Sequence, residues 1–189
     1  MESRKRIGAA LTGSFCTFSK ALPVIEELCA EYDIYPIMSE FAAATDTRFG
    51  RAADHIARLE RACGRSVICT ITGAEPIGPK RLLDALLILP CTGNTLGKLA
   101  NGITDTCVTM AAKAALRSGA PVVLGVSSND ALSASAKNIG LLMNVKNVFF
   151  IPFTQDDPTK KPASAVCDFS RARETLEAAL RGAQLTPVI

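Results

Sequence analysis

The sequence predicts an α/β fold, a Rossmann-like (flavodoxin-like) doubly wound parallel sheet of about six strands with helices on both faces. Three observations support this prediction. Short apolar runs alternate with helical patterns along the chain, as they do in consecutive βαβ units. One run, residues 86–89 (LLIL), lacks polar alternation, which is typical of a parallel strand buried on both faces. The 189 residues show no linker and no internal repeat, so we expect one domain over residues 1–189.

The first half of the chain alternates strands with helices. Strands are expected at 7–11, 34–38 and 67–70 and in the run that ends at residue 89, and helices at about 19–31 and 50–63. Gly64 follows the second helix and is expected to end it. The polar stretch 39–49 and the Gly- and Pro-rich stretch 72–80 are expected to be loops.

The second half continues the same alternation. The polar loop 91–95 leads into a helix, and Asp105 is expected to be the N-cap of the next helix, which ends at Gly119. The polar residues 127–130 are expected to cap a weaker helix that reaches about Met143. The other expected elements are strands at 121–126 and 148–153, a charged loop at 154–162 and a last helix at about 164–180.

The composition narrows the function classes. Apolar residues make up 48% of the chain and charged residues 21%, which is typical of a globular protein. The net charge of +3 is too small to indicate a nucleic-acid partner, and no basic face is interleaved with aromatic residues. No apolar segment is long enough for a signal peptide or a membrane helix, so we expect a cytoplasmic protein without a membrane partner.

The seven cysteines do not form a recognisable metal or disulfide pattern. No CxxC pair occurs and the chain has a single histidine, so we expect no metal site. An odd number of cysteines is consistent with small, mostly buried residues in a reducing compartment. Cys91 lies in a polar loop, and buried filler is still the preferred interpretation for it.

Four strand ends carry polar loops, and in a doubly wound sheet such loops gather along one edge, where they can line a single cleft. The first loop resembles a phosphate-binding turn but lacks both the GxGxxG spacing and the Walker lysine, which favours a mononucleotide over a dinucleotide or ATP. Taken singly, each loop can also be ordinary turn chemistry. The candidate cofactor-binding residues are Thr12, Gly13, Ser14, Ser39, Thr45, Pro90, Thr92, Gly93, Asn94, Thr95, Ser127 and Asn129.

The acid–base candidates near these loops are Glu40, Asp46, Asp105 and Asp130. Asp105 is interpreted as a cap, and Asp130 is preferred because it follows the fifth strand. His55 lies beside the apolar stripe of its helix and is interpreted as a surface or partly packed residue. With one histidine, no Ser-His-Asp or Cys-His arrangement can be argued.

The string PCTGNT at residues 90–95, followed by Lys98 and Asp105, resembles the Pro-Ala-Ser-Ala-Asn-Thr motif of flavin-dependent cysteine decarboxylase-like proteins. The resemblance implies a Rossmann-like flavoprotein that binds FMN at subunit contacts and assembles as trimers or multiples of them. Two departures speak against decarboxylation. The region of the family's catalytic histidine reads EPIGP at 75–79, and its Pro-x-Met-Asn segment is replaced by VSSN at 126–129.

Other strings resemble a narrower family, the dipicolinate synthase B subunits of spore-forming bacteria. They are TDTRFG at 45–50, EPIGPK at 75–80, NDAL at 129–132 and the segment 152–162. The resemblance implies that the chain works with the A subunit of dipicolinate synthase to oxidise dihydrodipicolinate to dipicolinate in the mother cell during sporulation. It also implies NADP as the acceptor, expected on the A subunit because the nicotinamide-binding fingerprint is absent here.

Aromatising a dihydropyridine ring requires an electron acceptor and a base. We expect Asn94 and Asn129 to position the flavin or the dicarboxylate, and Asp130 or Glu75 to accept the proton. Two alternatives remain at this point. The chain can be an independent FMN-dependent decarboxylase-like enzyme, or a non-catalytic partner that stabilises the A subunit through the loop 154–162.

Overall fold

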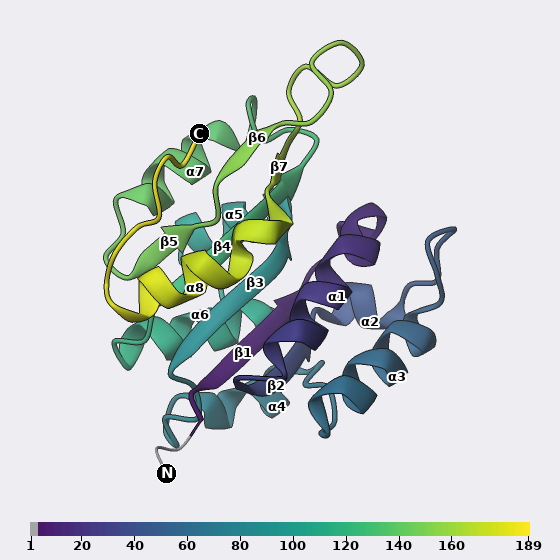
Figure 1. Ribbon diagram of the computed structural model, residues 1–189, viewed down its shortest axis with the longest axis vertical. Helices are drawn as coiled ribbons and strands as arrows, with labels where there is room; N and C mark the ends of the chain where they lie inside the picture. The colour runs from purple at the N-terminus through teal and green to yellow at the C-terminus, as the bar shows by residue number, and fades with distance from the viewer. Residues whose placement is uncertain (1–3) are drawn as a thin grey trace.

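The computed structural model describes residues 4–189, which form a seven-stranded sheet flanked by helices (Figure 1). The strands are β1 (Arg6–Leu11), β2 (Asp33–Met38), β3 (Ala85–Cys91), β4 (Val122–Ser128), β5 (Val148–Phe150), β6 (Phe153–Gln155) and β7 (Ala165–Cys167). The helices are α1 (Phe18–Leu28), α2 (Glu40–Ala44), α3 (Ala52–Cys63), α4 (Ile71–Ala74), α5 (Gly93–Ala100), α6 (Cys107–Arg117), α7 (Ala136–Met143) and α8 (Ala172–Leu180). Single 3₁₀ turns lie at Phe15–Thr17, Glu75–Ile77 and Phe169–Arg171.

The central strands are parallel and run in the order β2-β1-β3-β4-β5. This order is that of doubly wound flavodoxin-like sheets, so the predicted fold class is confirmed. The chain changes direction across the sheet between β1 and β3, and the crevice outside the carboxyl ends of these strands is where such folds bind ligands. The fold therefore places the predicted loops at a binding edge.

Helices cover both faces of the sheet. In Figure 1, α1 and α8 lie in front of the strands, and α5 and α6 lie behind them. Every residue of β3 is buried, as expected of a central parallel strand with two covered faces. Within residues 4–189, no helix has both the length and the apolar character that a membrane span needs.

The carboxyl-terminal part differs most from the prediction. The strand expected at 148–153 is two strands, because β5 ends at Phe150 and β6 begins at Phe153. The helix expected at 164–180 begins with a strand, β7, which pairs antiparallel with both β4 and β6. A 3₁₀ turn follows, capped by the side chain of Asp168, and α8 begins only at Ala172. The sheet is therefore mixed at this edge.

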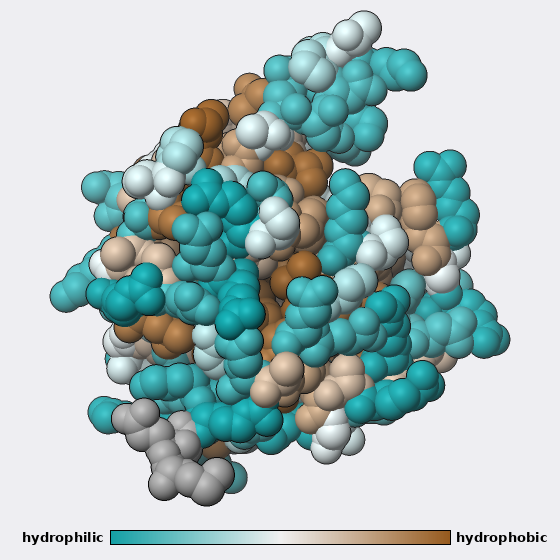
Figure 2. Space-filling model, viewed as in Figure 1, coloured by the Kyte–Doolittle hydropathy of each residue, from teal (hydrophilic) through white to brown (hydrophobic). Residues whose placement is uncertain are grey.

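The loop between β6 and β7 projects from the body of the molecule in Figure 1, and its surface is largely hydrophilic in Figure 2. Its residues 156–162 are mostly exposed, as the predicted charged loop requires. The loop is closed by two short antiparallel strands rather than by a helix, which is why it stands away from the sheet.

Three assignments in the first half were wrong for local reasons. The strand expected at 67–70 is a single bridge between Ile68 and Ile37. The loop expected at 39–49 contains α2, because the Ser39 side chain accepts a hydrogen bond from the N–H of Ala42 and starts a helix. The loop expected at 72–80 contains α4 and a 3₁₀ turn in which Pro76 occupies the first turn, where proline is tolerated.

Two helix starts also differ. Thr106, and not Asp105, is the N-cap of α6, with a reciprocal capping box between Thr106 and Thr109. Helix α7 begins at Ala136, so residues 127–130 do not cap it. The expected helix ends at Gly64 and Gly119 are confirmed, since both glycines have positive φ angles of 67° and 82°.

Gly125 offers a test of how tightly the sheet packs. A Cβ at this position in β4 would contact Leu89 Cδ1, and would lie 3.1 Å from Cys167 Sγ and 3.2 Å from Ile151 Cδ1, all on buried residues. We expect Gly125→Ala to lower the free energy of unfolding by about 1–3 kcal/mol through overpacking. Urea denaturation measures this change.

The matched control is Gly140→Ala in α7, where a Cβ meets no atom within 4 Å. There the free energy of unfolding should rise by about 0.5–1 kcal/mol, because alanine replaces glycine inside a helix. Equal midpoints for wild type and Gly125→Ala would contradict the packing argument.

Candidate functional site

Two hollows lie side by side at the carboxyl edge of the sheet. Hollow A has a volume of about 670 Å³ and lies between the β1–α1 loop, the end of β4 and the β6–β7 loop. Hollow B has a volume of about 690 Å³ and lies between the ends of β1, β2 and β3 and the start of α6. Gly13 and Thr92 line both. The single predicted cleft is therefore a pair of adjoining hollows.

The predicted cofactor residues divide between the two. Ser14, Ser127 and Asn129 line hollow A, whereas Thr12, Ser39, Asn94 and Thr95 line hollow B. The remaining three, Thr45, Pro90 and Gly93, line neither hollow and support the loops instead. The Thr45 hydroxyl donates a hydrogen bond of 2.6 Å to the Phe41 carbonyl.

Thr12 and Pro90 connect the two central loops. The Thr12 hydroxyl donates to the Pro90 carbonyl over 2.8 Å and accepts from the Thr92 N–H over 3.0 Å. The Thr12 N–H also donates to the Pro90 carbonyl, at 3.3 Å. One buried hydroxyl thus fixes the ends of β1 and β3 relative to each other, directly between the hollows.

A second hydrogen bond joins two loops at hollow A. The hydroxyls of Ser14 and Ser127 lie 2.7 Å apart, joining the loop after β1 to the end of β4. The backbone N–H groups of Gly13, Phe15 and Cys16 donate no hydrogen bond within residues 4–189. These donors and hydroxyls form a polar wall that suits a phosphate or carboxylate.

Hollow B is surrounded by helix starts. Ser39, Thr70, Thr92 and Thr106 line it, and each is the N-cap of a helix, namely α2, α4, α5 and α6. Each cap side chain accepts one backbone N–H. The N–H groups of Phe41 and Asn94 donate to no atom of the described chain. The hollow therefore presents partial positive charge and free donors.

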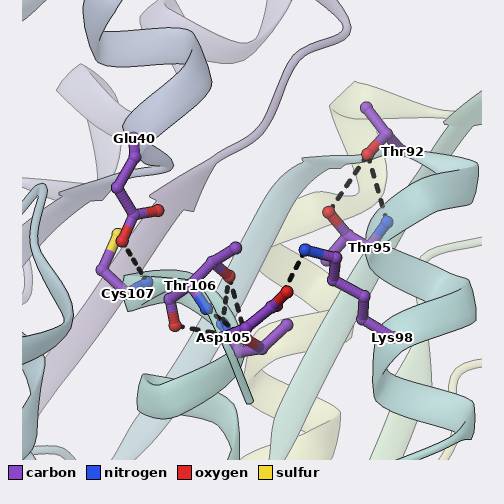
Figure 3. A network of polar contacts seen from close by, with 8 residues as sticks. Glu40, Thr92, Thr95, Lys98, Asp105, Thr106 and Cys107 are labelled. Carbon is purple, nitrogen blue, oxygen red and sulfur yellow. Dashed lines mark hydrogen bonds and ion pairs between the residues drawn. The ribbon is translucent and has the colours of Figure 1, made fainter. Parts of the chain in front are cut away.

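The two hollows differ in formal charge. In hollow A, Lys20 has no carboxylate within 4.0 Å among residues 4–189, and Lys161 lies 3.5 Å from Asp156. In hollow B, Lys98 lies 2.7 Å from Asp105, and Glu40 adds a second carboxylate (Figure 3). Hollow A thus has one positive charge in excess, and hollow B one negative charge.

The acids in pairs are held in their charged forms. The hydrogen bond from Lys98 lowers the pKa of Asp105. Burial acts to raise the pKa of Asp156, but hydrogen bonds from Ser164 and Lys161 and the charge of Lys161 leave it below its usual value. Both carboxylates are therefore occupied by partners at neutral pH.

Glu40 differs from these acids. Its Oε1 accepts the N–H of Cys107 over 2.8 Å, at the first residue of α6 (Figure 3). Its Oε2 is buried and has no hydrogen-bond partner in the described part of the chain. The carboxylate is thus fixed through one oxygen at a helix N-terminus, where the helix dipole attracts an anion, while the other oxygen is free.

The predicted catalytic acids lie elsewhere. Asp130 lines neither hollow, and its carboxylate accepts hydrogen bonds from the hydroxyls of Ser128 (2.5 Å) and Ser135 (3.0 Å). Ser128 in turn accepts the N–H of Gly93. Glu75 is exposed at the start of a 3₁₀ turn and also lines neither hollow. The structure does not bring these two carboxylates together.

The hydrogen-bonded cluster of Asp130, Ser128 and Ser135 requires a glycine at position 93. A Cβ there would lie 2.5 Å from Asp130 Oδ1 and 2.6 Å from Ser128 Oγ, so only glycine fits without displacing them. The glycine therefore permits close packing of α5 against the turn after β4.

Asp46 and His55 make contacts that stabilise the fold. Asp46 Oδ1 accepts the N–H of Ala52 at the start of α3, and the His55 ring packs edge-on against Phe18 with centroids 5.0 Å apart. Burial lowers the pKa of His55. The histidine lines neither hollow, which agrees with its interpretation as a partly packed residue.

The buried cysteines are poor nucleophiles. Burial raises the pKa of Cys107 and of Cys167 to about 12, and it also raises the pKa of Cys91. The interpretation of Cys91 as buried filler is confirmed. Cys16 is exposed and lines hollow A, a position that the sequence did not reveal.

Asp130 can be tested as a structural residue. We expect Asp130→Ala to lower the free energy of unfolding by about 1–3 kcal/mol, because it leaves the hydroxyls of Ser128 and Ser135 without their acceptor. The exposed Glu75→Ala is the control and should change it by less than about 0.5 kcal/mol. Chemical denaturation of both variants gives the comparison, and an Asp130→Ala protein as stable as wild type would remove the structural role.

Comparisons with known proteins agree with this architecture. The chain is 48% identical over 186 residues to the B subunit of dipicolinate synthase from Bacillus subtilis (strain 168), covering 98% of this chain and 93% of that protein. The crystal structure of the dipicolinate synthase B subunit from Bacillus halodurans C matches with a TM-score of 0.89 and 44% identity, over 97% and 95% of the two chains.

More distant structures share the fold. The FMN-dependent cysteine decarboxylase SpaF matches with a TM-score of 0.66 and 21% identity, over 93% of this chain and 97% of that chain. The sequence model of the family described as Flavoprotein matches residues 1–175. The resemblances drawn from the sequence are thereby confirmed. The chain belongs to the flavoprotein family and, within it, to the dipicolinate synthase B subunits.

Proposed function

We propose that this chain is a flavin-binding B subunit of dipicolinate synthase. It would act with the A subunit to oxidise dihydrodipicolinate to dipicolinate during sporulation, in the mother-cell cytoplasm. The proposal rests on one observation above all: the 48% identity to a protein of that name extends over 98% of the chain.

The site has the donors that FMN requires. Phosphate is an anion, and hollow A offers Lys20 together with the free N–H groups of Gly13, Phe15 and Cys16. The uncharged ring has several polar edges, and hollow B offers Thr92, Asn94 and Thr95. Because the hollows meet at Gly13 and Thr92, one elongated molecule can extend across both.

Bound FMN would supply a reversible hydride acceptor. The residues of this chain would orient the ligands: Asn94 and Asn129 by their amide groups, and Ser14 and Ser127 by their hydroxyls. NADP would be held by the A subunit, because this sequence has no GxGxxG turn after a strand. The oxidation also needs a proton acceptor, which Asp130 and Glu75 can provide only if a ligand reaches them outside the hollows.

The chain would work as a homo-oligomer, a trimer or a multiple of it, in addition to its contact with the A subunit. Two apolar side chains at this edge are exposed, Phe41 at 66% and Phe49 at 44%. These two line hollows B and A respectively. A neighbouring copy of the chain that covers them would also close the hollows from water.

Binding of FMN is the direct test. Titration of FMN, followed by its visible absorbance and fluorescence, should show saturable binding, and Lys20→Met should weaken it about ten- to a hundredfold by removing a charged hydrogen bond to the phosphate. Lys146→Met is the control, since Lys146 is exposed and lines neither hollow. Riboflavin, which lacks the phosphate, should bind wild type and Lys20→Met equally.

The alternatives give different results. A protein that turns over a cysteine-containing peptide with FMN alone would be a decarboxylase-like enzyme. A protein that refuses FMN, yet still activates the A subunit when the loop residues of both hollows are changed, would be a non-catalytic partner. Dipicolinate formation in a mixture of both subunits, dihydrodipicolinate and NADP would support the proposal only if changes in the hollows abolish it.

A further inference from the structure

The oxidation proposed above releases a proton as well as a hydride, so the site needs a base. Three carboxylates line the hollows in the described part of the chain: Glu40 and Asp105 in hollow B and Asp156 in hollow A. Asp105 is bonded to Lys98 at 2.7 Å, and Asp156 lies 3.5 Å from Lys161. Glu40 is the acid whose second oxygen has no partner among residues 4–189.

The position of Glu40 is fixed by its surroundings. Ser39 caps α2, so Glu40 is the first residue of that helix. Its Oε1 accepts the Cys107 N–H, and Figure 3 shows Oε2 turned toward the side on which Thr92 and Thr95 lie. Oε2 is buried, and no donor among residues 4–189 reaches it. A buried acceptor without a donor is uncommon and calls for an explanation, and Glu40 lines a hollow in which a bound ligand can provide one.

We infer that Glu40 is the base that accepts the proton of the dihydropyridine substrate, an inference that rests on the proposed function. One ring C–H leaves as hydride to an oxidised nicotinamide or flavin. A second hydrogen leaves as a proton to Glu40 Oε2, and the electron pair of its bond completes the aromatic ring. The substrate thus loses two electrons and two hydrogens, the acceptor gains the hydride, and Glu40 later releases its proton to water.

The groups around Glu40 suit this role. The Cys107 N–H stabilises the carboxylate without donating a proton that could neutralise it. The other titratable groups of this region are the thiols of Cys69 and Cys107 and the Lys98–Asp105 pair. Burial raises the pKa of Cys107 to about 12, so its thiol remains uncharged and does not compete as a base.

The test variant is Glu40→Gln in the complex reconstituted with the A subunit. Glutamine keeps an oxygen for the Cys107 N–H and replaces the free oxygen by an amide, so the fold is preserved while the base is lost. We expect kcat for dipicolinate formation to fall by about 10²–10⁴-fold, the range of a general base.

Three controls make the outcome specific. Asp105→Asn, in the same hollow, should retain kcat within a few-fold because Asp105 is already paired. Asp130→Asn is the comparison variant for the acid that the sequence favoured. Assaying Glu40→Gln at saturating FMN, with its FMN affinity measured separately, distinguishes a lost base from a lost cofactor.

The failures of the two proposals are distinguishable. A wild-type complex that forms no dipicolinate, or a chain that binds no FMN, overturns the proposed function. A wild-type complex that is active, with Glu40→Gln equally active, overturns the role of Glu40 alone. Loss of activity in Asp130→Asn but not in Glu40→Gln would assign the base to Asp130.

Discussion

The hydroxyl of Thr12 holds the functional edge together. It donates to the Pro90 carbonyl and accepts the Thr92 N–H, so one buried atom joins the loops after β1 and β3 where the order of the sheet reverses. Thr92 is also the N-cap of α5 and lines both hollows. If this connection were lost, the wall between the hollows would lose its position, and the helix behind it would lose the orientation of its cap.

The central strands were predictable because their sequence signal is strong. The runs at 7–11, 34–38 and 86–89 contain no charged residue, and burial within a parallel sheet favours that pattern. The elements that the sequence did not predict are short. Strand β7, Ala165–Cys167, has only three residues, too few to show a strand period of their own. The extended conformation of β7 depends on its pairing with β4 and β6. The sequence of β7 itself does not reveal these partners.

The candidate site was predicted in outline and not in detail. The four polar loops were found because turn residues follow apolar runs, and the loops do meet at one edge. Their division into two hollows depends on where helices start. A five-residue helix, α2, places Glu40 against the first residue of α6, and the sequence between 39 and 49 reads as a polar loop. Asp130 was favoured by its position after a strand, whereas its two hydroxyl partners determine where its oxygens point.

The two hollows separate charges of opposite sign. This separation allows Glu40, the proposed base, and the lysines that would bind anions to lie in one site without pairing. Lys98 and Asp105 lie in the same hollow and pair at 2.7 Å, which occupies both. A lysine placed beside Glu40 would bind its free oxygen in the same way. Lys20 and Lys161 instead line hollow A, on the other side of Gly13 and Thr92. Anionic ligand groups can therefore be held by cations without neutralising Glu40, the carboxylate proposed to accept a proton.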